Sequence, residues 1–275
     1  MIFLIQIFLS VLVTLVFSLR ESFSFDFGGI LNLALVFIVA NIVVMIIIFI
    51  IFVLLIYLTE KYSDKALWKH KVFDLYNHYI FNFIYRVKPI IFGKENLPKD
   101  NNFVVVSNHV EYTDPLYIKQ VYKDFPLAFV SKAELFEYPL IKTLVKSTGN
   151  IPLSRKSGDR QALNTILQAI KKIKDGQPMG IFPEGTRSYS NQVAEFKAGS
   201  FKMAQKAQAD ISTVVLYNMH ETRKKFKFFR VKVYIKVLPI IKYEEYSEMS
   251  TNDLSDFIRE KIVKEITNFD DFLRR

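Results

Sequence analysis

Two long apolar segments open the chain, and a region in which apolar and polar positions alternate follows them. Residues 1–18 carry no charged side chain, and residues 30–58 contain Asn32 and Asn41 as their only strongly polar members. An α-helix rises about 1.5 Å per residue, so about 20 residues cross the hydrocarbon core of a membrane. The first segment is barely long enough to span it, and the second is long enough to tilt. The pattern therefore predicts a transmembrane helical hairpin over residues 1–60.

The residues that flank the hairpin predict its orientation, because Lys and Arg favour the cytoplasmic side of a membrane. Arg20 shares the connecting loop with Glu21 and Asp26. The second segment is followed by four lysines, namely Lys61, Lys65, Lys69 and Lys71. We expect both ends of the hairpin, and the domain that follows, to lie on the cytoplasmic side of the cell membrane. A cleaved signal peptide is the alternative for residues 1–18, but the basic start and small-residue cleavage site of such a peptide are both missing.

Residues 61–86 form a connecting segment. Apolar and aromatic side chains recur at spacings of three and four between residues 72 and 86, which is typical of a helix with one apolar face. That face either lies in the membrane interface or packs on the domain, and the pattern favours neither.

Beyond residue 87, short β-branched runs alternate with amphipathic segments. The predicted strands cover residues 87–92, 103–107, 127–130, 150–153, 179–182, 211–216 and 231–238. The predicted helices cover residues 115–123, 135–146, 159–174, 199–208 and 252–267. This alternation predicts an α/β domain over residues 87–275, with a largely parallel central sheet flanked by helices. Functional sites in such sheets gather beyond the carboxyl ends of the strands.

Composition and charge narrow the function classes. The 275 residues include no Cys, which excludes a disulfide scaffold, a thiolate zinc site and a Cys nucleophile. The net charge of +10 favours a polyanionic partner. The densest basic stretch, residues 223–232, is interleaved with Phe and forms either a surface against anionic lipid or an acyl carrier, or a solvated strand pair. A run of about five to eight basic residues, expected of a nucleic-acid-binding tail, is not present in the sequence.

One strand-to-helix connection carries the most informative chemistry. The apolar strand 103–107 stops at Ser107, and Pro115 favours the first position of a helix with Asp114 as its cap. His109 and Asp114 should therefore share a compact loop in which their side chains fold back on one another. A carboxylate bonded to one imidazole nitrogen leaves the other nitrogen as a base. A surface His beside a helix-capping Asp is the alternative for this pair taken alone.

Other predicted strand ends carry cations. Arg187 follows the strand 179–182 in a loop turned by Gly and Pro, whose hydroxyls and backbone amides suit a phosphate cradle. Arg155 and Lys132 follow two further strands. Four strand ends thus supply one base and three cations, which suits a phosphorylated acceptor.

This combination resembles the bacterial 1-acylglycerol-3-phosphate acyltransferase (PlsC-like) family of glycerolipid acyltransferases. The resemblance rests on Asn108-His109 with Asp114, on the loop 149–155, and on the sequence Phe-Pro-Glu-Gly-Thr-Arg-Ser at residues 182–188. Phe-Lys-Ala-Gly at residues 196–199 is also typical of it. These motifs stand in the family's order and spacing between residues 87 and 237.

The resemblance implies a fold, a base and a substrate site. The fold is a glycerolipid acyltransferase-type α/β domain preceded by the N-terminal transmembrane hairpin. His109 is implied as the catalytic base and Asp114 as the acid that orients it. The implied substrate-binding residues are Asn108, Lys132, Arg155, Glu184, Gly185, Thr186 and Arg187. No metal site is implied.

Three positions depart from the family's usual pattern. Ser154 stands where an Asp usually precedes the Arg of the second motif. Residues 211–215 lack the usual Pro, and residues 110–113 read Val-Glu-Tyr-Thr in place of the commoner Gln-Ser type. The first two departures leave the exact acceptor open.

These features predict an O-acyltransferase of phospholipid biosynthesis. It would move a fatty acyl group from acyl carrier protein (acyl-ACP) or coenzyme A (acyl-CoA) to the sn-2 hydroxyl of 1-acylglycerol-3-phosphate (lysophosphatidic acid), giving phosphatidic acid. The thioester is already activated, so no cofactor is expected. The expected partners are membrane lipid, lysophosphatidic acid and the thioester donor, without nucleic acid.

Several alternatives stay open. Within the same reaction, the acceptor could be glycerol-3-phosphate or another lysophospholipid or glycolipid. In other classes, the chain could be a non-catalytic lipid-binding membrane protein or a membrane-tethered nucleic-acid binder.

Overall fold

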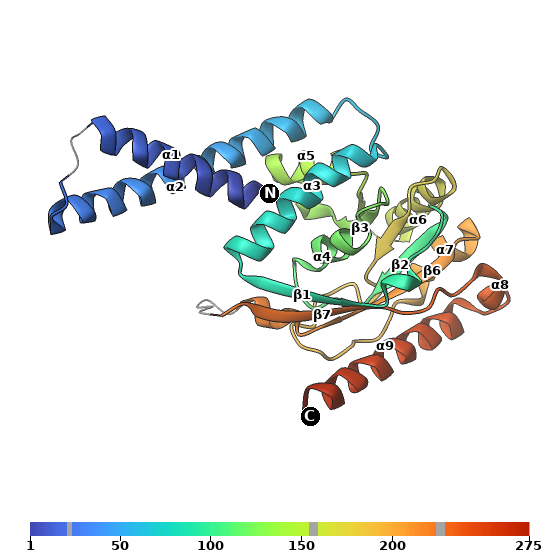
Figure 1. The fold of residues 1–275 in the computed structure, drawn as a ribbon. Helices are drawn as coiled ribbons and strands as arrows, with labels where there is room; N and C mark the ends of the chain where they lie inside the picture. Colours follow the sequence, from blue (N-terminus) through green and yellow to red (C-terminus); the bar gives the residue numbers. More distant parts are fainter. Residues whose placement is uncertain (21–23, 154–158, 224–228, 275) are drawn as a thin grey trace. The chain divides into compact units, whose positions relative to one another are not determined.

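The computed structural model describes residues 1–20, 24–153, 159–223 and 229–274. The chain divides into two compact units, Met1–Thr59 and Glu60–Arg275 (Figure 1). Residues 72–86, predicted as a connecting helix, belong to the second unit.

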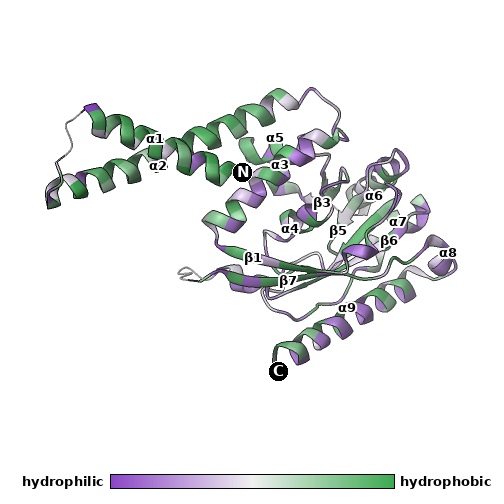
Figure 2. Ribbon diagram, in the orientation of Figure 1, coloured by the Kyte–Doolittle hydropathy of each residue, from purple (hydrophilic) through white to green (hydrophobic). Residues whose placement is uncertain are grey.

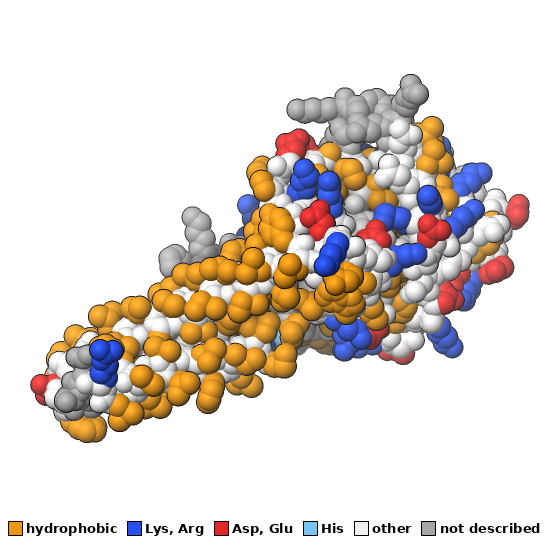
Figure 3. Space-filling view, turned by 90° about the horizontal axis from the view of Figure 1, so that it is seen from above, with side chains coloured by type: hydrophobic (Ala, Val, Ile, Leu, Met, Phe, Trp, Pro, Cys, Tyr) orange, Lys and Arg blue, Asp and Glu red, His pale blue; other side chains and the backbone are white. Residues whose placement is uncertain are grey.

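The first unit is a pair of helices, α1 (Ile2–Arg20) and α2 (Phe27–Thr59). Both are long and apolar enough to cross a membrane, as judged from length and composition. Hydrophobic residues run along both helices, and hydrophobic side chains cover their surface (Figures 2 and 3). The expected helical hairpin is therefore present.

Polar side chains of the two helices meet inside this unit. The amide of Gln6 donates a hydrogen bond to Asn41 Oδ1 at 2.8 Å, and Asn41 Nδ2 lies 3.4 Å from Ser10 Oγ. Ser10 and Thr14 donate their hydroxyls to backbone carbonyls one turn earlier. These polar contacts join the two helices to one another.

The second unit is an α/β domain. Within the described residues, the strands form one seven-stranded sheet in the order β1-β7-β6-β2-β5-β3-β4. The strands are β1 (Val87–Phe92), β2 (Phe103–Ser107), β3 (Ala128–Lys132), β4 (Ile151–Leu153), β5 (Met179–Ile181), β6 (Asp210–Tyr217) and β7 (Val231–Val237). The α-helices are α3 (Leu67–Tyr79), α4 (Asp114–Val121), α5 (Pro139–Ser147), α6 (Asp159–Lys174), α7 (Lys202–Ala207), α8 (Tyr243–Tyr246) and α9 (Thr251–Arg274). Short helical turns lie at η1 (Ile80–Ile84), η2 (Lys94–Asn96), η3 (Ala133–Phe136), η4 (Ala198–Phe201) and η5 (Met219–Arg223).

The sheet is largely parallel, which confirms the predicted fold class. β2 pairs in parallel with β5 and β6, and β3 pairs in parallel with β4 and β5. β7 runs antiparallel to β6, and β1 pairs in parallel with β7, so these two strands run against the others. The connection between β6 and β7 contains the 3₁₀ turn η5, and an antiparallel pair needs no crossover helix.

The side chains of the central strands alternate between two hydrophobic cores. Val104 and Val106 join the core beneath α6, α7 and α9, whereas Phe103 and Val105 join the core that includes residues of α4. Successive side chains of a strand point to opposite faces, so a fully apolar strand must be covered on both sides. Helices therefore flank both faces of the sheet (Figure 1).

Several predicted helices differ in detail from the structure. The segment 199–208 is the turn η4 followed by α7, and the helix predicted at 252–267 extends as α9 to Arg274. The segment 135–146 is interrupted: η3 ends at Phe136, and α5 begins at Pro139, because the residue before a proline is pushed out of the helical conformation. The segment 72–86 starts earlier, as α3, and continues as the π-helical turn η1. It buries Phe73, Tyr79 and Phe81, so one of its faces packs on the domain.

Candidate active site

The site begins where β2 ends and α4 starts. The imidazole Nδ1 of His109 lies 2.9 Å from Asp114 Oδ2, and the same oxygen accepts the backbone N–H groups of Val110 at 2.6 Å and Glu111 at 2.8 Å. Pro115 occupies the first turn of α4, where its missing N–H costs nothing. The helix begins one residue earlier than predicted, with Thr113 in place of Asp114 at its cap, and His109 folds back onto Asp114 as predicted.

Asp114 is fully buried, with 0% of its surface exposed. Burial raises the pKa of its carboxyl, and the hydrogen bonds from His109, Glu111 and Val110 oppose that rise by favouring the ionised form. Its other oxygen, Oδ1, is buried and has no hydrogen-bond partner within the described residues. The carboxylate is thus held in one orientation, toward His109.

The imidazole lies on an aromatic stack. The ring of Phe182 is parallel to that of His109, with 4.1 Å between centroids, and Phe129 stacks behind Phe182 at 5.7 Å. A Cβ atom at Gly180 would lie 2.3 Å from Phe129 Cε1, so glycine there leaves room for the second ring. Phe129 on β3 and Phe182, directly after β5, therefore fix the plane of the imidazole.

Glu184 fixes the backbone of the same loop. One carboxylate oxygen accepts the His109 N–H at 2.7 Å, and the other accepts the Ala194 N–H at 3.0 Å. Only 3% of Glu184 is exposed, and burial raises the pKa of its carboxyl. A substrate contact was predicted for Glu184, but its carboxylate holds the loop and is absent from the cavity wall described below.

Asn108 is engaged in a similar way. Its amide donates to the Leu216 carbonyl at 2.8 Å and accepts the Leu216 N–H at 2.9 Å, which joins the end of β2 to β6. The side chain is 1% exposed. Both polar ends of the amide are bonded to the backbone of β6, and the substrate contact of Asn108 stays a prediction.

A cavity of about 590 Å³ opens beside the imidazole. Its polar side chains are His109, Ser131, Lys132, Thr186, Arg187, Lys197 and Ser200. Its apolar or aromatic side chains include Phe129, Val130, Leu135, Leu153, Ala162, Ile181 and Phe182. The cavity therefore offers cations next to the base and an apolar wall formed by the adjoining elements.

Among the described residues, three cations line this cavity. Lys132 and Arg187 were predicted to do so, and Lys197 joins them. Lys132 forms an ion pair with Glu134 at 3.1 Å. Arg155, also predicted, lies outside the described residues, as does Ser154.

Arg187 is held by aromatic stacking. Its guanidinium carbon lies 3.3 Å from the centroid of the Tyr112 ring and 5.3 Å from that of Tyr189. Its buried Nη1 has no hydrogen-bond partner in the part of the chain that the structure describes. Such stacking orients a guanidinium while leaving its donors available for an anion.

Gly185 and Thr186 shape the rim of the cavity. Gly185 has a φ of +67° and closes a turn by donating its N–H to the Phe182 carbonyl at 3.0 Å. A Cβ atom there would lie 3.1 Å from Lys197 Nζ, so a larger residue would press on that cation. Thr186 lines the cavity with its side chain exposed.

Sequence reasoning missed several residues of the site. Lys197 lies in the Phe-Lys-Ala-Gly stretch that was recognised as typical, but no role was assigned to it. Tyr112 lies in a segment that departs from the family pattern, and its ring supports Arg187. The stacking of Phe182 on His109 had no local signal, since strands distant in the sequence bring the rings together. Within the described residues, no cluster of three His, Asp or Glu side chains suits a metal ion.

Comparisons with known proteins show which proteins the chain is similar to. The family model described as Acyltransferase matches residues 88–217. The chain is 35% identical over 182 residues to a 1-acyl-sn-glycerol-3-phosphate acyltransferase from Borreliella burgdorferi, covering 66% of this chain and 72% of that protein. It is 34% identical over 154 residues to a probable 1-acyl-sn-glycerol-3-phosphate acyltransferase from Mycoplasma pneumoniae, covering 54% of this chain and 56% of that protein.

The fold is also similar to a solved structure. The crystal structure of the 1-acyl-sn-glycerophosphate acyltransferase PlsC from Thermotoga maritima matches with a TM-score of 0.63 and 25% sequence identity. The match covers 73% of this chain and 79% of that one. The similarity therefore extends well beyond the short motifs.

Proposed function

The chain belongs to the 1-acyl-sn-glycerol-3-phosphate acyltransferase family and is an O-acyltransferase, and from that premise we propose how it acts and on what. It transfers a fatty acyl group from an acyl thioester to the sn-2 hydroxyl of 1-acylglycerol-3-phosphate, and phosphatidic acid is the product. The observation that carries this proposal is the His109–Asp114 pair at a cavity that combines cations with an apolar wall.

His109 is the general base of this reaction. Its Nδ1–H donates to Asp114, which leaves Nε2 free to take the proton of the acceptor hydroxyl. The hydroxyl oxygen then attacks the thioester carbonyl carbon and forms the new C–O bond. The imidazolium, stabilised by the Asp114 carboxylate, returns the proton to the sulfur as the C–S bond breaks. A thiol has a pKa of about 8.5, so it leaves readily, and no cofactor is required.

Lys132, Arg187 and Lys197 bind the phosphate of the acceptor. Arg187 is the strongest candidate, since a guanidinium binds phosphate through two parallel hydrogen bonds and its Nη1 lacks a partner within the described residues. Fixing the phosphate positions the hydroxyl next to the imidazole, and such placement lowers the barrier of the reaction.

The apolar wall of the cavity accommodates a fatty acyl chain. Leu135, Leu153 and Ile181 lie on the same cavity as the base, and a fatty chain removed from water there gains roughly 0.8 kcal/mol for each buried methylene. Asn108 and Glu184 act as positioning residues, because each holds the loop of His109 through hydrogen bonds to backbone groups.

The hairpin anchors the enzyme in the cell membrane. Both of its helices are long and apolar enough to span the bilayer. Four lysines follow α2 between residues 61 and 71, which favours a catalytic domain on the cytoplasmic side. An acceptor and a product with fatty chains partition into the same bilayer.

A direct assay tests the proposed reaction. The purified full-length protein in detergent is given radiolabelled acyl-ACP or acyl-CoA together with lysophosphatidic acid. His109→Ala should lower the rate by about 10²-fold or more. Activity within about threefold of the parent would show that another group is the base.

A panel of acceptors in the same assay tests the substrate. Glycerol-3-phosphate and other lysophospholipids or glycolipids are the competing acceptors for this chemistry. Faster transfer to any of these would reassign the acceptor but leave the role of His109 intact. A parent protein without transfer to any acceptor would favour a non-catalytic lipid-binding role.

A further inference from the structure

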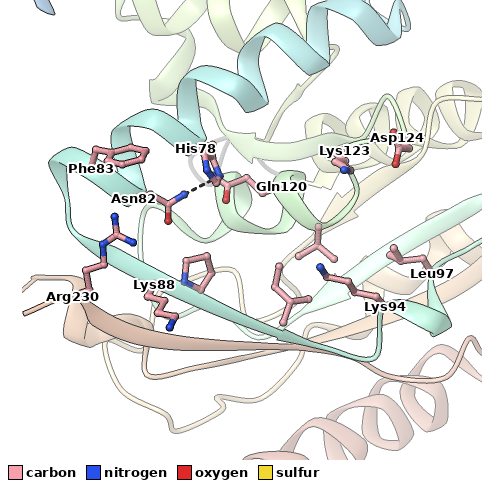
Figure 4. Close-up of a pocket in the computed structure, with 13 residues that line it drawn as sticks. His78, Asn82, Phe83, Lys88, Lys94, Leu97, Gln120, Lys123, Asp124 and Arg230 are labelled. Carbon is pink, nitrogen blue, oxygen red and sulfur yellow. Dashed lines mark hydrogen bonds between the residues drawn. The ribbon is translucent and has the colours of Figure 1, made fainter. Parts of the chain in front are cut away.

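A second cavity, of about 600 Å³, lies in the Glu60–Arg275 unit between α3–η1 and β1 (Figure 4). Its walls come from α3 and η1, from β1 and the turn after it, from the end of α4, and from the start of β7. The side chains that line it are His78, Asn82, Phe83, Lys88, Pro89, Ile91, Lys94, Leu97, Gln120, Val121, Lys123, Asp124 and Arg230. It shares no lining residue with the candidate active site, so it is a separate cleft.

The cleft is strongly basic. Lys88, Lys94, Lys123 and Arg230 line it, and Asp124 is its one acidic side chain. Asp124 is paired at 3.7 Å with Lys71, which is not part of the lining. Within the described residues, Lys88, Lys94 and Lys123 form no ion pair. Four cations along a cleft with one carboxylate, itself paired with Lys71, leave an excess of positive charge that attracts an anion.

Neutral hydrogen-bond donors complete the wall formed by the helices. His78 Nδ1 accepts from the Asn82 amide at 2.8 Å, which leaves its Nε2 to carry the hydrogen. Burial and the nearby Arg230 lower the pKa of His78, so it remains a neutral donor. The amide nitrogen of Gln120, on the neighbouring wall, is buried and has no hydrogen-bond partner in the described part of the chain.

Apolar groups border these polar ones. Phe83 and Ile91 line the cleft, and the guanidinium of Arg230 lies 5.5 Å from the centroid of the Phe83 ring. Beside the lining residues in sequence, Phe229 is 78% exposed and Tyr85 is 49% exposed. Exposed aromatic side chains next to Lys and Arg are typical of a surface that contacts the membrane interface.

We propose that this cleft binds the phosphate headgroup of an anionic phospholipid, which is attracted by the cations spread along its walls, Lys88, Lys94, Lys123 and Arg230. The aromatic helix at 72–86, whose environment the sequence left open, contributes His78, Asn82 and Phe83 to the cleft, and Arg230 comes from the basic stretch. An acidic carrier protein would match the charge but not the adjoining apolar residues, so the lipid fits better. The lipid would hold the catalytic domain against the bilayer at a place other than the substrate cavity.

A charge-removal experiment tests this assignment. Short-chain phosphatidylglycerol, below its critical micelle concentration, is titrated by calorimetry into the full-length protein in neutral detergent at low salt. The triple variant Lys88→Gln, Lys94→Gln, Lys123→Gln should bind it at least about tenfold more weakly, and added salt should reduce the difference. The matched control, Lys202→Gln, Lys206→Gln, Lys264→Gln, removes the same charge from exposed positions on α7 and α9 and should bind like the parent.

Further arms separate the possible ligands. Inorganic phosphate should bind the parent at least about tenfold more weakly than the lipid, because it lacks the apolar part. Equal loss of lipid binding in both triple variants, or none in either, would overturn the proposal. Equal affinity of the parent for phosphate and for lipid would also overturn it. So would a triple variant that loses binding of acyl carrier protein but keeps binding of the lipid. Acyl transfer to detergent-dispersed acceptor should stay within about twofold in both variants, so the outcome does not depend on the proposed reaction.

Discussion

Asp114 must stay ionised to orient His109, although its side chain is fully buried. Burial raises its pKa, so the folded state favours the protonated form more than the unfolded chain does. The ionised carboxylate therefore reduces stability at neutral pH, and that penalty disappears as the pH falls through the folded pKa. The ionised carboxylate lowers the stability of the fold, but the reaction needs its charge, and functional sites often trade stability for activity in this way.

Replacing this acid separates stability from activity. Asp114→Asn keeps an oxygen for the Val110 and Glu111 N–H groups but removes the charge. We expect about 10²–10⁴-fold lower kcat, since the imidazole loses its partner and tautomer. The apparent Tm at pH 7 should be equal to or above that of the parent. A variant with a clearly lower Tm would contradict the raised pKa, and one with near-normal kcat would contradict the orienting role.

Arg187 is expected to act on substrate affinity. Arg187→Lys removes both the stacking on Tyr112 and the paired donors, so KM for lysophosphatidic acid should rise about tenfold or more while kcat changes less. Tyr112→Phe keeps the ring and serves as the control, with little effect expected. An unchanged KM in Arg187→Lys would exclude Arg187 from phosphate binding.

At this scale, the sequence predicted residues whose signal is local. His109 and Asp114 could be paired because Pro115 ends the loop between them. The engagement of Asn108 by Leu216 could not be predicted, since the partner lies 108 positions away and is reached only through the sheet. The same applies to Glu184, whose partner is the backbone of His109, 75 positions earlier.

Among the elements, β3 and the residue that follows β5 support the imidazole through ring contacts. Gly180 leaves room for Phe129, which stacks on Phe182 and thereby supports the plane of His109. Gly180→Ala should lower stability by about 1–3 kcal/mol through overpacking, and it should lower kcat because the stack shifts. The measurements are chemical denaturation and steady-state kinetics. Gly199→Ala is the control, because a Cβ atom at Gly199 meets nothing within 4 Å.

If Gly180→Ala loses stability but keeps the parent kcat, the aromatic stack supports only the fold. If neither quantity changes, the close approach of Phe129 to the backbone of β5 is wrong.

Within the hairpin, Asn41 joins α2 to α1. Asn41→Leu removes its contacts with Gln6 and Ser10, and we expect a loss of about 0.6–2 kcal/mol in the association of the two helices. Amide hydrogen exchange of residues 2–20 in lipid nanodiscs should accelerate. Val43→Leu changes a neighbouring exposed position and should leave the exchange rate unchanged. Equal exchange in the two variants would exclude Asn41 as a link between the helices.

The elements themselves were largely predictable from periodicity. Strands 87–92 and 103–107 and helix 159–174 have the predicted bounds. The errors lie where periodicity has no information: Pro139 splits a helix, and the aromatic segment begins earlier and ends in a π-helical turn. The missing Pro of the fourth motif leaves β6 uninterrupted from Asp210 to Tyr217.

Over the whole domain, buried titratable groups connect α3 to α4. His70 lies inside the domain, where burial and then the charge of Lys119 lower its pKa to about 3. The unfolded chain binds a proton below about pH 6.5 and the folded protein does not, so this group lowers stability as the pH falls from about 6.5 toward 3. Asp74 has the opposite effect. Burial raises its pKa to about 7, so this group increases stability as the pH falls from about 7 toward 4.

A comparison of the parent with the variant His70→Gln isolates the contribution of His70 to the pH dependence of stability. His70→Gln keeps a donor for the Asp64 carbonyl but cannot take up a proton. Relative to the parent, its free energy of unfolding should rise by up to about 1.4 kcal/mol for each pH unit below 6.5. Denaturant titrations at pH 7, 6 and 5 measure this difference. Parallel pH profiles would show that His70 is protonated in the folded state.

The layered α/β architecture followed from the alternation of strands and helices, but the strand order did not. The reversal of β7 and β1 depends on contacts between segments far apart in the sequence, which no local pattern encodes. Sites near those strands, such as the basic cleft, were therefore visible only in the structure.

The pairing of β1 with β7 has a consequence for how the protein is made. In the described sheet, β1 has β7 as its one neighbour, and Val87 pairs with Val231. During synthesis, β1 leaves the ribosome long before its partner exists, so its backbone edge stays open while most of the domain is translated. A nascent chain stopped before residue 231 would expose that edge, and we expect such fragments to depend on chaperones or to aggregate. The new chain would then be protected from misassembly when β7, the last strand, is completed, more than when the hairpin is inserted.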